Sequence, residues 1–173
     1  MAKLVLTLIG DDREGLVSGL SRAVAEHGGN WLEGQLARLA GKFAGVVLVD
    51  IPDEREVDFR AAAAEVDGLD VHVTTADDAE ELSGTPMALH LVGNDRVGIV
   101  REVTGVLAAL GVSIDEMHTS TRPAPMADTV LFEAAAQLRL PEGTDSAKVR
   151  EALEQIAAEL IVDLELDESQ DNA

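Results

Sequence analysis

The chain has 173 residues, no cysteine and a formal net charge of −20, because 33 acidic residues outnumber 13 basic ones. The lack of cysteine excludes disulfides, a thiolate zinc site and a cysteine nucleophile. The acidic excess opposes the phosphate backbone of nucleic acids, which argues against direct DNA binding. Since the sequence has no apolar run of about 18 residues and no secretory leader, we expect a soluble, cytoplasmic protein without membrane contact.

The first half of the chain predicts the order strand, helix, strand, strand, helix, strand. Leucines at every second position from Leu4 to Leu8 indicate a strand, and apolar residues four apart from Leu16 to Val24 indicate one face of a helix. The predicted elements are a strand over 3–9, a helix over 15–27, two strands over 30–39 and 42–51 that form a hairpin at Ala40-Gly41, a helix over 54–66 and a strand over 69–74.

The second half repeats this order, since the segment from Leu6 to Val17 returns as Leu89 to Val100, 83 positions later. This match indicates a tandem duplication. The predicted elements are a strand over 87–92, a helix over 98–110, strands over 113–122 and 127–140, a helix over 146–160 and a strand over 161–166. The predicted domains are residues 1–82 and 83–173, with an acidic linker at 77–81, an acidic tail at 163–171 and the one length difference, about ten residues, at 134–144.

A βαββαβ unit of this size predicts an α+β, ferredoxin-like domain, in which two helices cover one face of a four-stranded antiparallel sheet. The opposite sheet face remains open. We expect four apolar residues on the two open faces, namely Val46, Leu48, Val130 and Phe132. A domain of about 80 residues buries little surface by itself, so we expect the domains to pair and the chain to form a homodimer.

The corner between the first strand and the first helix of each half carries the informative chemistry. The two corners read Gly10-Asp-Asp-Arg-Glu-Gly-Leu16 and Gly93-Asn-Asp-Arg-Val-Gly-Ile99. Free N–H groups at the start of a helix favour an anion such as a carboxylate. In an alternative structural interpretation, the first glycine makes the turn, the third residue caps the helix and the second glycine permits close packing. These residues are Gly10 and Gly93, Asp12 and Asp95, and Gly15 and Gly98, respectively. The spacing of a dinucleotide or phosphate loop is absent, so we expect no cofactor.

These motifs resemble the ACT domain family over both halves of the chain. The resemblance rests on a strand, then G-x-D-R-x-G-[LIV]-V, then a helix, then Gly-Gly-Asn30 or Gly-Val-Ser113 at the start of the next strand. A tandem pair of this length resembles the glycine cleavage system transcriptional repressor group. The resemblance implies that an amino acid or another small metabolite binds at domain interfaces. The implied ligand-binding residues are Gly10, Asp11, Asp12, Gly15, Leu16, Val17, Asn30, Gly93, Asn94, Asp95, Gly98, Ile99, Val100 and Ser113.

The two corners differ from the family pattern and from each other. Glu14 and Val97 stand where many members have proline, so the helix starts are less rigidly preset. Asp11 beside Asp12 favours a ligand ammonium and repels its carboxylate, whereas Asn94 tolerates an anion. We therefore favour the second corner. Small residues favour a compact ligand such as glycine or serine, and these are Gly15, Gly98 and Ser113.

Catalysis and metal binding find little support in the sequence. The four histidines, at 27, 72, 90 and 118, occur in unrelated contexts without a paired ligand spacing. Glu33 and Glu116 are equivalent acids on second strands, where carboxylates are more often solvated or ion-paired than catalytic. Hydroxyls near the first helices have no apparent base, and these are Ser18, Ser21 and Thr104. We therefore expect a non-enzymatic regulator that acts through a protein partner, such as a transcription regulator or a metabolic enzyme. The alternative is a ligand-independent dimerising scaffold or a regulatory subunit.

Overall fold

The computed structural model describes residues 1–76, 83–125, 128–160 and 162–168. The chain divides into two compact units, Met1–Ala79 and Glu80–Ala173, which we describe separately as domain 1 and domain 2. The predicted linker at 77–81 and the end of the predicted tail, at 169–171, lie outside the described residues. The predicted boundary between residues 82 and 83 lies at the edge of the same undescribed segment. No helix in the described ranges is long and apolar enough to cross a membrane.

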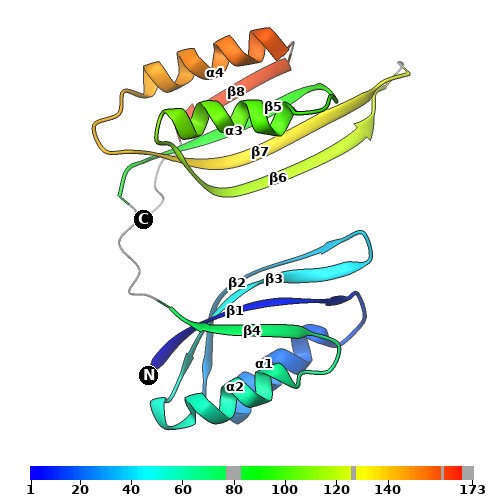
Figure 1. The fold of residues 1–173 in the computed structure, drawn as a ribbon, viewed down its shortest axis with the longest axis vertical. Coiled ribbons are helices and arrows are strands. Elements are labelled where there is room, and N and C mark those ends of the chain that lie inside the picture. The colour runs from blue at the N-terminus through cyan, green and yellow to red at the C-terminus, as the bar shows by residue number, and fades with distance from the viewer. Residues whose placement is uncertain (77–82, 126–127, 161, 169–173) are drawn as a thin grey trace. The chain divides into compact units, whose positions relative to one another are not determined.

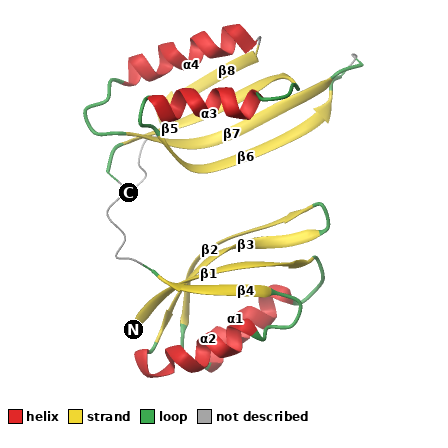
Figure 2. Cartoon of the chain, viewed as in Figure 1, coloured by secondary structure: helices red, strands yellow, loops and turns green. Residues whose placement is uncertain are grey.

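Domain 1 has the predicted order of elements (Figure 1). They are β1 (Ala2–Asp11), α1 (Leu16–Glu26), β2 (Asn30–Leu39), β3 (Lys42–Ile51), a short 3-10 helix η1 (Asp53–Arg55), α2 (Glu56–Ala64) and β4 (Asp70–Thr75). The strands form an antiparallel sheet in the order β2-β3-β1-β4. Both helices cover the same face of this sheet (Figure 2).

Domain 2 repeats this arrangement with the sheet order β6-β7-β5-β8. Its elements are β5 (Thr85–Asn94), α3 (Ile99–Ala109), β6 (Ser113–Pro123), β7 (Val130–Leu140), α4 (Ser146–Leu160) and β8 (Val162–Glu168). The predicted fold class, two ferredoxin-like domains, is therefore confirmed. The predicted acidic tail is wrong over 163–168, because these residues form β8 and pair with β5.

Each core lies between the helices and the inward face of the sheet. In domain 1 the predicted leucines Leu4, Leu6 and Leu8 are at most 4% exposed, and they belong to one buried cluster with Leu20 of α1 and Phe59 of α2. The corresponding cluster of domain 2 contains Met87, Leu89, Leu91, Leu107 and Leu153. Burial of each such side chain contributes roughly 1.5–3 kcal/mol to the free energy of unfolding. Apolar packing therefore stabilises each domain from within.

The two domains differ in the hairpin between their second and third strands. In domain 1 the paired residues Leu39 and Lys42 enclose Ala40 and Gly41, which both have positive φ, 48° and 78°, as a tight hairpin turn requires. In domain 2 the corresponding pair is Arg122 and Leu131, so the offset between the domains rises from 83 to 89 within this hairpin. The prediction that all extra residues lie at 134–144 is therefore wrong.

The predicted open-face residues are only partly correct. Val46 is 47% exposed on the open face of domain 1, whereas Phe132 is 7% exposed and belongs to the core of domain 2. Phe132 pairs with Gly93 of β5 and has the same parity as the buried residues Ala134, Ala136 and Leu138 of β7. Val130, the first residue of β7, is 47% exposed. It lies on the same side of the strand as Phe132, which is the inward side, so it does not belong to the open face.

Candidate functional site

The two corners share one backbone conformation. Gly15 and Gly98 are the N-cap residues of α1 and α3, with φ of 86° and 91°, and neither helix has a side-chain cap. The predicted capping by Asp12 and Asp95 is therefore wrong. A Cβ on Gly15 would meet nothing within 4 Å, and one on Gly98 would meet only Glu102 at 3.7 Å. Glycine is needed here for its left-handed backbone and not, as the structural interpretation held, for close packing.

The first glycine of each corner has a different role from the predicted turn. Gly10 and Gly93 lie inside β1 and β5. A Cβ on Gly10 would stand 2.0 Å from the carbonyl oxygen of Gly68, and one on Gly93 would stand 2.1 Å from Cγ1 of Val162. At these glycines a neighbouring segment occupies the space that a side chain would need.

The helix starts present free donors. The first bonds that reach back from each helix to its N-cap run from the N–H of Gly19 to Gly15 (2.8 Å) and from the N–H of Glu102 to Gly98 (3.0 Å). Within the described residues, the N–H groups of Val17 and Val100 therefore have no acceptor, and their side chains are 43% and 41% exposed. By contrast, the predicted ligand-binding residues Leu16 and Ile99 are buried core residues, at 4% and 3% exposure. They anchor the helices.

The acids of the first corner are already paired. Lys42 hydrogen-bonds to Asp11, and Arg38 lies 2.7 Å from Asp12. The hydrogen bond and the charge of the Lys42 ammonium hold the pKa of the Asp11 carboxyl below its ordinary value of 3.8. These cations offset the repulsion that we predicted between this corner and a ligand carboxylate.

The second corner is unpaired by comparison. Asn94 and Asp95 are exposed, and neither side chain has a partner in the part of the chain that the structure describes. The backbone N–H of Asp95 donates to Val130 at 2.8 Å, which fixes the loop. Arg96 pairs with Glu102 on the first turn of α3. This corner therefore combines free N–H donors with an uncommitted amide and an uncommitted carboxylate.

The secondary candidates, Asn30 and Ser113, lie far from the corner of their own domain. Asn30 faces Asp50, which pairs with Lys3 at the start of β1, whereas Asp11 lies at its end. Eight residues of strand separate the two ends, roughly 26 Å. Ser113 lies opposite Arg139 at the equivalent end of domain 2. The structure therefore does not bring these predicted residues together within one domain.

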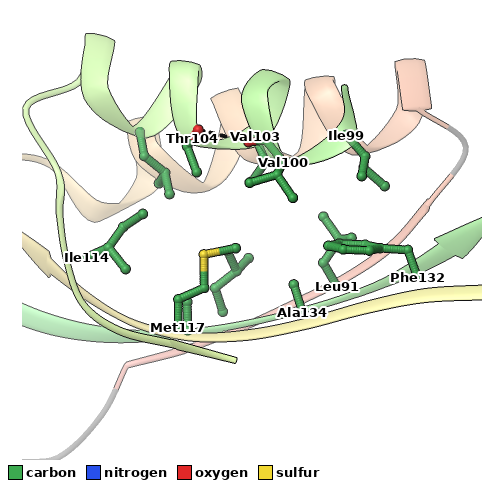
Figure 3. Close-up of a pocket in the computed structure, with 12 residues that line it drawn as sticks. Leu91, Ile99, Val100, Val103, Thr104, Ile114, Met117, Phe132 and Ala134 are labelled. Atoms are coloured by element: carbon green, nitrogen blue, oxygen red, sulfur yellow. Dashed lines mark hydrogen bonds between the residues drawn. The ribbon is translucent and has the colours of Figure 1, made fainter. Parts of the chain in front are cut away.

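A narrow apolar cavity of about 10 Å³ lies between α3 and the sheet of domain 2 (Figure 3). Ile114 and Met117 of β6 line it opposite Val100 and Thr104, whose hydroxyl donates to the carbonyl of Val100 at 2.8 Å. This volume suffices for about one water molecule, so the cavity is too small for an amino acid.

Domain 1 has Trp31 and Gly34 at the positions of Ile114 and Met117 in domain 2. A Cβ on Gly34 would stand 3.1 Å from the indole, so the ring of Trp31 occupies the space above Gly34. Trp31 packs against the core of domain 1. One duplicated position is therefore filled by an aromatic ring in domain 1 and lines a cavity in domain 2.

The structure offers no catalytic pair among its described residues. The hydroxyls of Ser21 and Thr104 donate to backbone carbonyls of their own helices. Glu116 is exposed and contacts His118 at 2.8 Å, and Glu33 is exposed on β2. Catalysis would need a nucleophile within hydrogen-bond reach of a base.

Two histidines that we had judged unrelated do belong together. His90 of β5 and His118 of β6 both pair with Ala135 of β7, so they lie in one row across the open face of domain 2. The sequence held a signal for His90 alone, because the neighbouring residues Leu89 and Leu91 of β5 are apolar and buried, whereas the neighbours of His118 on β6 include the exposed Thr119. Only the pairing register reveals that the two rows coincide.

Known proteins match the fold, and the family model matches the first domain. The ACT domain family matches residues 2–73. A UPF0237 protein of Methanocaldococcus jannaschii is 36% identical over 67 residues, which are 39% of this chain and 73% of that protein. The crystal structure of an unknown protein from Galdieria sulphuraria is 30% identical, with a TM-score of 0.87 over 98% of this chain and 99% of that chain.

A more distant structure, of a protein proposed to be a glycine cleavage system transcriptional repressor, is 18% identical, with a TM-score of 0.68 over 96% of each chain. At this identity the likeness concerns the fold alone. Together with the family match and the two βαββαβ units, these findings identify the architecture. The chain belongs to the ACT domain family and carries two such domains in tandem.

Proposed function

We propose that the protein is a non-enzymatic regulator that binds a small amino acid at the second corner. One observation carries this proposal, namely that Asn94, Asp95 and the first-turn N–H of Val100 are all without partners at one place. A helix start suits the α-carboxylate of an amino acid, and a free carboxylate suits its ammonium. Glycine and serine are favoured because Gly98 leaves the corner without a side chain.

Regulation would follow from linkage. A ligand that binds one arrangement of the protein more tightly shifts the population towards that arrangement, and a protein partner reads the shift through its own affinity. The net charge of −20 argues that a transcriptional effect would pass through such a partner and not through direct DNA contact. The name of the distant structural relative associates this regulation with glycine or one-carbon metabolism.

A second candidate function is a scaffold that pairs without any ligand. It is favoured by the open face of domain 1, where Ile9 is 50% exposed and Val46 is 47% exposed on neighbouring strands. Apolar side chains gathered on one face indicate a surface that another protein or a second copy covers. A homodimer through this face is compatible with either function.

Thermal unfolding with each of the twenty amino acids tests the first function. A ligand at about a hundred times its Kd adds about 2.7 kcal/mol, which raises the Tm by roughly 5 to 10 °C. Asn94→Ala should remove this rise without changing the Tm of the free protein, because the amide has no partner. Gln35→Ala is the matched control, since Gln35 is also an exposed amide residue but lies in the middle of β2, outside both corners. No rise with any amino acid would leave the scaffold function.

A further inference from the structure

The open sheet face of domain 1, which the helices leave uncovered (Figure 2), has an uncharged centre. Three consecutive rows of its two central strands carry only small or apolar side chains on this face, and these are Val5, Thr7 and Ile9 of β1 and Ala44, Val46 and Leu48 of β3. Ile9 and Val46 are 50% and 47% exposed. Val46 lines two hollows, of about 340 and 360 Å³. The face therefore presents apolar ridges and hollows for packing against another surface.

Four charges stand at the ends of these two strands. At one end Lys3 of β1 lies opposite Asp50 of β3, and at the other end Asp11 of β1 lies opposite Lys42 of β3. Lys42 pairs with Asp11 within the chain. By contrast, neither Lys3 nor Asp50 forms an ion pair with another described residue. Each strand therefore has a cation at one end and an anion at the other, in opposite order.

A two-fold axis parallel to the strands, midway between β1 and β3, lays β3 of one copy over β1 of a second copy. The facing pairs are then Val5 with Leu48, Thr7 with Val46, and Ile9 with Ala44. The protruding Ile9 thus faces the small Ala44. At the strand ends, Lys3 of each copy comes to Asp50 of the other, so the two unpaired groups meet twice. Packed sheets align within about 30°, and the flexible lysine side chain spans the displacement that this angle causes.

The size of the face matches what a reversible dimer needs. The sheet has four strands of 6 to 10 residues. With about 4.8 Å between strands and about 3.4 Å per residue, its face covers roughly 600 Å². Two such faces together bury roughly 1,200 Å², which lies at the lower end of the range for specific interfaces.

We propose that the open face of domain 1 pairs with the same face of a second copy about this axis. A second copy fits because the alternating charges match their own two-fold image. An axis perpendicular to the strands would instead bring Lys3 to Asp11, whose charge Lys42 already offsets. The net charge of −20 makes two copies repel, so an uncharged centre is where they can meet. The inference rests on the face of the scaffold function and supplies its partner, and it does not depend on ligand binding at the second corner.

The open face of domain 2 is unsuited to such pairing. Arg139 stands where domain 1 has Asp50, and Pro86 stands where domain 1 has Lys3, so the alternating charges are missing. Three acids occupy one side of the edge strand β8, and these are Asp163, Glu165 and Asp167. Like charges that face each other oppose association. Of the two open faces, that of domain 1 therefore suits a second copy.

Sedimentation equilibrium of charge-reversed chains tests the proposal. The intact chain should dimerise. Lys3→Glu and Asp50→Lys should each raise the Kd of the dimer at least about tenfold, because each variant brings like charges together twice. An equimolar mixture of the two variants should regain nearly the affinity of the intact chain, since every reversed residue then meets an opposite charge. The matched control is Lys148→Glu, which changes the net charge as Lys3→Glu does but at an exposed position of α4; it should leave the Kd nearly unchanged.

A monomeric intact chain, or a mixture that dimerises no better than the single variants, would overturn the proposal. The Tm of each variant shows whether it folds. In 1 M NaCl the Kd of Lys3→Glu should approach that of the intact chain, because salt screens exposed charges; a difference that salt leaves unchanged would also overturn the charge pairing. The rise in Tm with amino acids is measured on Lys3→Glu as well. Loss of the dimer with the rise retained, or the reverse, separates failure of this inference from failure of the ligand site.

Discussion

The side chains on the open sheet faces differ between the two domains, although the order and pairing of the strands that carry them are the same. On the face of domain 1 the central residues are apolar, and they are Val5, Ile9, Val46 and Leu48. The register aligns them with Ala88, Val92, Ala135 and Gln137 of domain 2. Histidines and carboxylates surround the latter set, as His90 with Glu133 illustrates. One face therefore suits an apolar protein surface, whereas the other carries polar and charged side chains.

The inward side shows the opposite trend. Leu6 and Leu89 are equivalent and buried, at 0% and 4% exposure, and Gly15 and Gly98 share one backbone conformation. A core position is constrained by all of its neighbours at once, whereas an exposed strand position is not. The duplication therefore preserved what folds the domain and left the open face and the corner side chains free to acquire separate roles.

The largest difference between the domains is expected from the first corner glycines. Gly10→Ala places a methyl group 2.0 Å from a backbone carbonyl, whereas Gly93→Ala meets the side chain of Val162. Backbone yields less than a side chain, so we expect a loss of about 3 kcal/mol for Gly10→Ala and about 1 kcal/mol for Gly93→Ala. Urea unfolding followed by the fluorescence of Trp31, the only tryptophan of the chain, and by circular dichroism measures both. Equal losses would contradict the distinction.

The second difference concerns the open faces. Val46→Asp places a charge in the centre of the apolar face, and it should weaken self-association by about 2 kcal/mol, or roughly thirtyfold, if a second copy covers that face. Ala135→Asp is the matched control at the equivalent position of domain 2, and it should leave self-association unchanged. Sedimentation equilibrium measures both constants. Equal weakening by the two variants would place the interface elsewhere.

The third difference concerns the space above Gly34, which the indole of Trp31 fills in domain 1. Trp31→Ile installs the residue of domain 2 and leaves the space above Gly34 empty, so we expect a loss of about 2 kcal/mol. Trp31→Phe retains a ring and should lose less than half of this. Unfolding in urea, followed by circular dichroism, measures both variants. If the two substitutions cost the same, the indole does not fill the space that the geometry indicates.

Sequence patterns predicted the strands and helices well, because the spacing of apolar residues follows directly from which face of each element is buried. The strands over 30–39 and 42–51 and the helix over 146–160 begin and end where they were predicted. The roles within the corners were less accessible. The close approach of Gly68 to Gly10 joins residues far apart in the chain, and no local pattern encodes it.

The partners of exposed side chains could not be predicted from the sequence either. The repulsion predicted for Asp11 and Asp12 ignored Lys42 and Arg38, which reach the corner only through the strand register. Phe132 was assigned to the wrong face because the six residues added in the hairpin shifted the alignment of the two domains. Register is a tertiary property, and it decides which exposed residues meet.

The smallest expected effect is a difference between the two corners in how stability depends on pH. The hydrogen bond and charge of Lys42 lower the pKa of Asp11 below 3.8 in the folded protein. A depressed carboxyl pKa stabilises the folded state fully above the unfolded value, and this contribution is lost as the pH falls through the folded pKa. Asn94 has no such titration, so of the two corners only the first loses stability in this way below about pH 4.

A ¹³C NMR titration of the Asp11 carboxyl measures the effect directly. Its midpoint should lie below 3.8, and Lys42→Met should return it towards that value because both lowering causes come from Lys42. Asp11→Asn, which copies the second corner, should make the acid unfolding of domain 1 less steep. A midpoint at or above 3.8 in the intact chain would show that Lys42 does not hold this carboxylate in solution. The first corner would then present an uncompensated acid, and its exclusion of a ligand carboxylate would again distinguish it from the second.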